Sequence, residues 1–343
     1  MTMAPTRMLL VLGGTGWLGG AIARAALADG WAVTCLARGE SGTAPAGVEW
    51  VRADRREPTA YQAVAGRKWD AVVEVSWQPG MVRSALAALA PAAAHWTYVS
   101  SVSVYADESQ PGMDESAAVL PAYTGTEPVA IEGYGEAKVA CERASAKAVG
   151  DRLLVARAGL IGGYGDRSDR FGYWPARFAA PSGPSGEVLV PDAAEEATQT
   201  VDVQDLATWL VSAAAAGRVG VFNAVGEVHA LGEVLAAARS AAGHHGPVVA
   251  VPSDWLREQG VEPYMGPESL PLWLPDPGYE GHSRHDGSAA VAAGLRHRPL
   301  GELVASALAW ERERGLDRER RAGLTPARER ELLAAWTGRA AGN

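Results

Sequence analysis

Cysteine is nearly absent from this chain of 343 residues. Only Cys35 and Cys141 occur, one in an apolar segment and the other in a helical one. We therefore expect two buried free thiols rather than a disulfide. Cysteine and histidine also do not recur at the spacings of metal ligands, so no metal site is predicted.

The sequence also lacks long apolar runs and an excess of positive charge. No hydrophobic segment reaches the length of a membrane span, and residues 1–7 are too few for a signal peptide before the first strand. The formal net charge of −9 disfavours nucleic-acid binding, which needs basic patches. We expect a cytoplasmic protein that binds neither membrane nor nucleic acid and acts on a small-molecule substrate.

What the chain has is a glycine-rich turn between an apolar strand, residues 8–12, and a helix, residues 21–28. In a strand–turn–helix unit, Gly13 permits the tight turn, Gly16 lets a pyrophosphate approach the backbone, and Gly19 lets the helix pack closely. The helix N-terminus offers free N–H groups to phosphates. The predicted cofactor contacts here are Gly13, Thr15, Gly16, Trp17, Leu18 and Gly19. The alternative is a glycine-rich turn without a ligand.

Strands and helices alternate over the first half of the chain. Strands are predicted at residues 8–12, 32–36, 48–53, 70–75, 95–100 and 153–156, with helices at 21–28, 81–89 and 134–149. This alternation is typical of an α/β fold, a Rossmann-type doubly wound parallel sheet with helices on both faces.

The pattern changes after Ile161. Further helices are predicted at residues 173–180, 205–216, 231–242, 253–259, 300–314 and 326–336, with strands at 187–190, 201–203 and 220–224. We expect a dinucleotide-binding domain over residues 1–165, to which residues 200–225 return. Residues 166–199 and 226–343 would form a smaller C-terminal α/β substrate-binding domain.

Three features of the second half have a local interpretation. Residues 263–285 are rich in proline, glycine and tryptophan, which fits either a substrate lid or a long surface loop. The mixed charges of residues 311–321 favour a solvated helix face rather than a binding patch. Thr325 is a suitable N-cap for the last helix, and Pro326 suits its first position.

The end of the second strand should approach the adenosine ribose of a dinucleotide. An acid there favours NAD, whereas an arginine accommodates the 2′-phosphate of NADP. The chain has Ala37 and Arg38 at this place, with no acid before Glu40, which favours NADP(H) over NAD(H). Arg38 as an ordinary surface arginine is the alternative. Asp54, after the third strand, is placed to meet the adenine amino group or simply to cap a helix.

Lysine is scarce, yet one of the three lysines follows a tyrosine at helical spacing. Tyr134 and Lys138 lie at i and i+4, on one face of the predicted helix. An ammonium beside a phenol favours the phenolate, which suits a group that exchanges protons. The fifth strand ends in serines at 100, 101 and 103, where parallel sheets bind ligands.

These motifs together resemble the extended short-chain dehydrogenase/reductase superfamily, in its NAD-dependent epimerase/dehydratase group. The matching segments are 13–19, 100–105, 134–138, 157–162 and 201–205, with Asp54. Residues 170–177 look most like those of actinobacterial reductase-like members. The resemblance covers residues 8–240 well and allows a homodimer through the helices near Tyr134.

The resemblance implies a role for each matching residue. Ser101 would polarise the substrate oxygen, with Ser103 as its competitor. Tyr134 would be the general acid/base, and Lys138 would hold the nicotinamide ribose. Two departures matter. Serine, valine and serine at 101–103 replace the Thr-Asp-Glu triplet of sugar-nucleotide dehydratases, and Ala158 replaces the usual proline beside the nicotinamide.

An NADPH-dependent reductase of a ketone or aldehyde is the leading hypothesis. A nucleotide-sugar epimerase with tightly bound NAD is the alternative enzyme, which would need Arg167, Arg170 or Arg177 for a second diphosphate. A dinucleotide-sensing binding protein is the non-enzyme alternative. The candidate substrate contacts are Trp77, Gln78, Ser103, Tyr164, Tyr173 and Trp174.

Overall fold

The computed structural model describes residues 6–342, so residues 1–5 of the predicted short N-terminal segment lie outside the described residues. Its largest element is a seven-stranded parallel sheet in the order β10-β6-β5-β4-β1-β2-β3. The strands are β1 (Met8–Leu12), β2 (Ala32–Ala37), β3 (Glu49–Arg52), β4 (Ala71–Glu74), β5 (Trp96–Ser101), β6 (Leu153–Ala158) and β10 (Gly220–Ala224). The Rossmann-type α/β prediction is confirmed.

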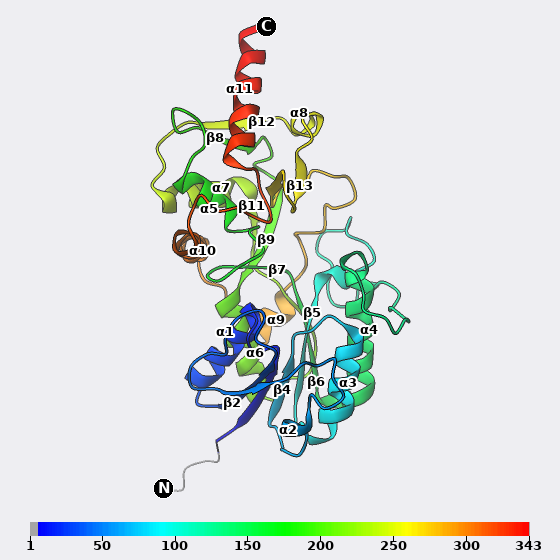
Figure 1. Cartoon of the computed structure of the whole chain (residues 1–343). Helices are drawn as coiled ribbons and strands as arrows, with labels where there is room; N and C mark the ends of the chain where they lie inside the picture. Colours follow the sequence, from blue (N-terminus) through cyan, green and yellow to red (C-terminus); the bar gives the residue numbers. More distant parts are fainter. Residues whose placement is uncertain (1–5, 343) are drawn as a thin grey trace.

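Helices cover both faces of this sheet (Figure 1). Because side chains alternate along a strand, Leu9 and Val11 of β1 face one hydrophobic cluster, while Leu10 and Leu12 face another. The first cluster contains α1 (Trp17–Ala28), α6 (Val203–Ala215) and α9 (Ser288–Ala292); the second contains α2 (Gln62–Ala65), α3 (Pro79–Leu89) and α4 (Tyr134–Val149). Short 3₁₀ turns are η1 (Ala90–Ala92), η2 (Val102–Val104), η3 (Ile131–Gly133) and η4 (Gly150–Arg152).

A second hydrophobic core lies beyond the carboxyl ends of the strands, in the upper half of Figure 1. Its helices are α5 (Tyr173–Ala179), α7 (Leu231–Ala242), α8 (Ser253–Glu258), α10 (Leu300–Arg314) and α11 (Pro326–Gly342). It also contains the parallel pairs β8 (Val188–Pro191) with β12 (Val248–Val251), and β13 (Glu262–Tyr264) with β14 (Ser269–Pro271). We call this part the second core.

A small sheet connects the two parts. Its order is β11-β9-β7, with β7 (Leu160–Gly162), β9 (Ala197–Asp202) and β11 (Val228–Ala230). The sequence predicted only residues 201–203 of β9 as strand, and Val203 instead begins α6, with the Asp202 carboxylate accepting from the Gln204 N–H at 2.7 Å. The sequence prediction also missed β7, β11, β12 and α9, which are three to five residues long.

Most other predicted elements agree with the structure to within a few residues. The helices over 134–149, 231–242 and 300–314 have the predicted bounds, whereas α1 begins at Trp17 rather than Ala21. Both cysteines are buried and free as predicted, and burial raises the pKa of the Cys35 thiol to about 12 and that of Cys141 to about 11.

The segment 263–285 is not one unstructured loop. It includes β14 and part of β13, and its later residues are held by backbone hydrogen bonds to Glu108 and Gly112. The Gly281 N–H donates to the carbonyl of Glu108 at 2.7 Å, and the Gly112 N–H donates to that of Arg284 at 2.7 Å. These bonds fasten the segment to the sheet-bearing part.

Candidate functional site

The glycine-rich turn has the geometry that its spacing predicts. Gly13 adopts φ +97°, a conformation that favours glycine. A Cβ on Gly19 would lie 2.3 Å from the Gly13 carbonyl oxygen, so only glycine lets α1 come this close. A Cβ on Gly14 would lie 2.3 Å from the Cys35 sulfur, a packing role that the sequence prediction missed.

The N-terminus of α1 is open to a ligand. Gly16 is the N-cap and offers no side chain to cap the helix, and the first intrahelical bond runs from the Gly20 N–H to the Gly16 carbonyl at 2.7 Å. The N–H groups of the first turn therefore have no acceptor within the helix. Together with the helix dipole they favour an anion at this place.

A cavity of about 240 Å³ begins at this turn and extends along the carboxyl ends of β2, β3 and β4. Its walls are Leu12, Gly13, Thr15, Gly16, Leu36, Ala37, Arg38, Gly39, Glu40, Ser41, Ala53, Asp54, Arg55, Val75, Ser76 and Met81. Five of the predicted cofactor contacts, Gly13, Thr15, Gly16, Arg38 and Asp54, are among them. Trp17, Leu18 and Gly19 lie just beyond, in the first turn of α1.

The predicted selector Arg38 lies on the wall of this cavity. Its guanidinium pairs with Glu40 at 2.9 Å and lies 4.0 Å from the Asp54 carboxylate. Asp54 itself accepts from the backbone N–H and Nε of Arg56, each at 3.0 Å. These hydrogen bonds lower the pKa of Asp54 to about 2. Asp54 thus faces the cavity as an ionised group with its oxygens already bonded.

A buried ion pair under the cavity was not predicted from the sequence. Glu74, fully buried at the end of β4, accepts from Arg55 Nη1 at 2.8 Å and from the Ser76 N–H at 2.8 Å. Arg55 Nη2 also donates to the Met81 carbonyl at 3.0 Å. The pair fixes the loops after β3 and β4. An acid at the end of an apolar strand was the available signal.

Tyr134 and Lys138 lie on one turn of α4, as predicted. Lys138 is buried, and its Nζ donates to the Val99 carbonyl at 2.7 Å. The same Nζ lies 5.0 Å from the centre of the Tyr98 ring and 5.7 Å from that of Tyr134. The carbonyl and the two rings hold the ammonium where β5 ends.

The two candidate serines contact each other at the end of β5. Ser101 Oγ donates to Ser103 Oγ at 3.1 Å and accepts from the Ser103 N–H at 3.2 Å. Ser101 thereby caps η2. Ser100 instead donates to the Glu142 carboxylate, which also pairs with buried Arg157 at 2.9 Å. This Arg157–Glu142 pair, which the sequence prediction also missed, ties α4 to the ends of β5 and β6.

The candidate substrate residues have different environments. The Trp77 ring lies 5.4 Å from the Tyr134 ring, so Trp77 is beside the proposed acid/base. The Gln78 side chain is occupied by the backbone of Val129, with both bonds at 2.9 Å. Tyr164 is exposed, and its hydroxyl donates to Glu313.

The prediction for Trp174 is wrong. Its side chain is fully buried in the second core, and its indole N–H donates to the Pro271 carbonyl at 2.7 Å. Tyr173 is equally buried beside it. Both aromatics belong to α5, which is buried on several sides, and neither lines the cavity described above.

The three arginines named for a second diphosphate also differ in their burial and their contacts. Arg177 is buried and pairs with Glu329 at 2.8 Å, so it is neither a surface charge nor free for a second diphosphate. The Arg170 guanidinium lies 5.6 Å from the Tyr264 ring centre. Arg167 is exposed and donates from Nη1 to the Ser41 carbonyl at 3.0 Å.

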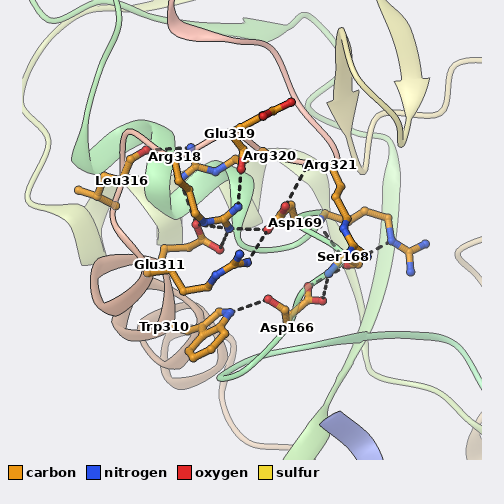
Figure 2. A network of polar contacts seen from close by, with 12 residues as sticks. Asp166, Ser168, Asp169, Trp310, Glu311, Leu316, Arg318, Glu319, Arg320 and Arg321 are labelled. Carbon is orange, nitrogen blue, oxygen red and sulfur yellow. Dashed lines mark hydrogen bonds and ion pairs between the residues drawn. The ribbon is translucent and has the colours of Figure 1, made fainter. Parts of the chain in front are cut away.

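The prediction that residues 311–321 form a solvated face is also wrong in part. Glu311 is buried and accepts from Arg318 at 2.9 Å and from Arg320 at 3.0 Å. Figure 2 shows this group beside Asp169, which bonds Arg318 and accepts from the Arg321 N–H at 2.8 Å. Asp169 lies 149 positions before Arg318, and Glu311 meets the two arginines only because the chain folds back after α10. The run of charges alone therefore could not reveal that these groups are buried.

Fold and site define a dinucleotide-binding protein of the doubly wound class. The model of the NAD dependent epimerase/dehydratase family matches residues 9–224, and the chain belongs to that family. None of the curated proteins matches the sequence.

Solved structures share this fold at low identity. UDP-N-acetylglucosamine 4-epimerase from Bacillus cereus is 18% identical with a TM-score of 0.64, over 90% of this chain and 100% of that one. UDP-glucose 4-epimerase from Bifidobacterium longum, in complex with NAD⁺ and UDP, is 18% identical with a TM-score of 0.62, over 89% and 98%. The UDP-glucose 4-epimerase from Thermus thermophilus, in complex with NAD, is 19% identical with a TM-score of 0.60, over 89% and 99%.

Among residues 6–342, no helix combines the length and the apolar character needed to cross a membrane.

Proposed function

We propose that this protein is an NADPH-dependent reductase of a ketone or aldehyde group in a small metabolite. The observation that carries the proposal is the arrangement at the carboxyl ends of the central strands. Ser101 is the last residue of β5, Lys138 on α4 bonds the Val99 carbonyl of the same strand beside the Tyr134 ring, and Arg38 lies on the wall of the cavity beside the glycine turn. No acid occupies the last position of β2, where NAD-binding sites commonly have one.

The residues present fit a nicotinamide dinucleotide. The uncapped first turn of α1 is suited to the diphosphate, and the cavity from Thr15 to Asp54 is suited to the adenosine half. Lys138 uses one of its three donors on Val99, which leaves two for ribose hydroxyls. When bound, the nicotinamide would supply the hydride.

The chain's own groups would handle the proton. Ser101 would donate a hydrogen bond to the substrate oxygen, at the cost of its present bond to Ser103. Tyr134 would give its phenolic proton to the same oxygen, and the nearby Lys138 charge would stabilise the phenolate left behind. Trp77, packed against Tyr134, would form one wall for the substrate, and the second core would form the far wall.

A nucleotide-sugar 4-epimerase is the second candidate, because the three solved structures compared above are 4-epimerases of UDP sugars. Such a substrate needs cationic partners for a second diphosphate. Arg177 is committed to Glu329 and to the Leu324 carbonyl, which removes one of the three arginines considered for that role. Arg167 and Arg170 remain for that role.

Calorimetric titration with NADPH and with NADH tests the proposal, after absorbance has shown whether nucleotide copurifies. Reversible binding that favours NADPH, followed by NADPH oxidation with a carbonyl substrate, is expected. Arg38→Ala should remove most of the preference, whereas Arg143→Ala, on an exposed part of α4, should not. Retained NAD or an NADH preference would support the epimerase instead. No binding of either would leave a protein without the proposed activity.

A further inference from the structure

Residues 163–170, here called the bridging segment, run from the end of β7 across the glycine turn. The indole N–H of Trp17, the first residue of α1, donates to the Tyr164 carbonyl at 2.8 Å. At Gly165, where φ is +93°, a Cβ would lie 2.7 Å from the Trp17 indole nitrogen. The bridging segment therefore lies directly against the helix whose N-terminus is suited to phosphate.

The other side of the bridging segment is fastened to the second core. The Asp166 carbonyl accepts from the Trp310 indole at 2.6 Å, and its buried carboxylate accepts from the Ser168 N–H at 2.7 Å. Asp169, also buried, is bonded by Arg318 and by the Arg321 N–H. Figure 2 shows both aspartates within this network. The two buried anchors, Asp166 and Asp169, thus flank a stretch of two residues, of which one is exposed.

That residue, Arg167, is exposed and extends away from the second core. Its Nη1 donates to the carbonyl of Ser41 at 3.0 Å, and Ser41 lies on the cavity wall with Arg38 and Glu40. A guanidinium has five N–H donors, so this bond leaves several for an anion. Because the anchors fix its backbone, only the side chain of Arg167 would have to be ordered on binding one.

The distribution of charge around Arg38 and Ser41 on the cavity wall favours Arg167 as a second group that binds an anion there. Arg38 is paired with Glu40 at 2.9 Å, and Arg56 is paired with Asp54, so each cation has a carboxylate beside it. Arg167 has no ion-pair partner within the part of the chain that the structure describes, and its one bond is to a neutral carbonyl. Arg167 therefore adds a positive charge that no carboxylate neutralises. The neighbouring Arg38, in contrast, is paired with Glu40.

We infer that Arg167 is a second ligand for the ribose 2′-phosphate, acting with Arg38 across the mouth of the cavity. The inference rests on the proposed NADP(H) function and extends it to a residue 129 positions later in the sequence. Two guanidinium groups on one phosphate can form parallel charge-assisted hydrogen bonds. Cofactor choice then depends on the second core, through the buried anchors on either side of Arg167.

Binding of two nucleotide fragments tests this assignment without any need for turnover. Adenosine 2′,5′-bisphosphate carries the 2′-phosphate, and adenosine 5′-monophosphate does not. For Arg167→Ala, calorimetry should show an affinity for the bisphosphate about 10-fold weaker, and an affinity for the monophosphate unchanged within about twofold. The affinity of Arg167→Lys for the bisphosphate should lie between those of the wild type and Arg167→Ala, because a lysine keeps the charge but loses the paired donors of the guanidinium. Arg143→Ala, with the same change of net charge, should match the wild type.

Each other outcome has a distinct meaning. Equal weakening of both fragments, or a fall in thermal stability shared by the Ala and Lys variants, would make Arg167 a support of the bridging segment and would overturn the inference. The inference would also be overturned if Arg167→Ala bound both fragments as tightly as the wild type while Arg38→Ala lost the preference for the bisphosphate. That result would leave the proposed NADP(H) function intact. A wild-type protein with no preference for the bisphosphate would overturn both proposals together.

Discussion

The carboxyl edge of the central sheet and the second core are built from different kinds of interaction. At the sheet edge, the functional groups occur in short segments, such as the turn from Gly13 to Gly19 and the Tyr134–Lys138 helical turn. In the second core, Asp169 bonds Arg318 across 149 positions, and Leu189 bonds Glu329 across 140. The sheet edge is therefore organised locally and the second core by long-range pairing, so single substitutions should act on chemistry in one and on stability in the other.

The sharpest test at the sheet edge is Tyr134→Phe. Removing only the hydroxyl should lower turnover about 10³-fold or more, because a positioned acid contributes 10²–10⁴-fold. The binding of NADPH should stay within about twofold of the wild type, since the ring still packs on Trp77. Steady-state kinetics with a carbonyl substrate and calorimetry with NADPH check the two parts. Retained turnover would remove Tyr134 from the proton-transfer role.

In the second core, the corresponding test is the effect of Glu311→Ala on stability. The carboxylate is buried between Arg318 and Arg320, so its loss leaves Arg320 without a carboxylate partner and Arg318 with Asp169 alone. Breaking a buried ion pair from one side typically costs about 3–5 kcal/mol of unfolding free energy. Urea unfolding measures this value.

The matched control is Glu331→Ala, which breaks the exposed Arg328–Glu331 pair at 3.3 Å. An exposed pair of this kind contributes about 0.5 kcal/mol or less. Similar small losses for Glu311→Ala and Glu331→Ala would contradict the distinction between a buried network and a solvated surface in this part of the chain.

The same contrast explains what the sequence could predict. Local periodicity and glycine spacing were sufficient for the seven-stranded sheet, the glycine turn and the Tyr134–Lys138 turn. They did not show that Glu311 is enclosed by Arg318 and Arg320, which follow it by seven and nine positions, because the chain folds back only after α10 ends. They also did not show that Trp174 is buried against Pro271, because that partner comes from a distant segment. Glu74, Arg157 and the bridging segment were missed for the same reason. Short strands such as β7 and β11 also carry too few residues for a periodic pattern.

His285 lies between the two regions, and its titration should couple stability to pH. Its side chain is buried against the Tyr105 ring, and both ring nitrogens lack a hydrogen-bond partner among the described residues. Burial, helped by the charge of His282 and opposed by that of Glu108, lowers the pKa of His285 from 6.5 to about 4. Between these pH values the unfolded state binds the extra proton, so stability falls as pH decreases from about 6.5 to 4.

His285→Phe isolates this effect, because other titrating groups are common to both proteins. Relative to the variant, the wild type should lose up to about 3 kcal/mol of unfolding free energy between pH 6.5 and pH 4. Urea unfolding at several pH values measures the difference. A difference that does not change with pH would show that the His285 ring takes up its proton equally well in the folded protein.

Thr325 is the exception within the second core, since its role is local and was predicted from the sequence. Its Oγ1 accepts from the Arg328 N–H at 3.1 Å, which makes it the N-cap of α11. Thr325→Ala should cost about 1 kcal/mol of unfolding free energy, and Thr325→Asp should restore it, because aspartate both caps and complements the helix dipole. Urea unfolding of the wild type and the two variants measures these differences in unfolding free energy. An equal loss in both would mean that the threonine methyl group, rather than the cap, stabilises the start of α11, and that packing governs even this local motif in the second core.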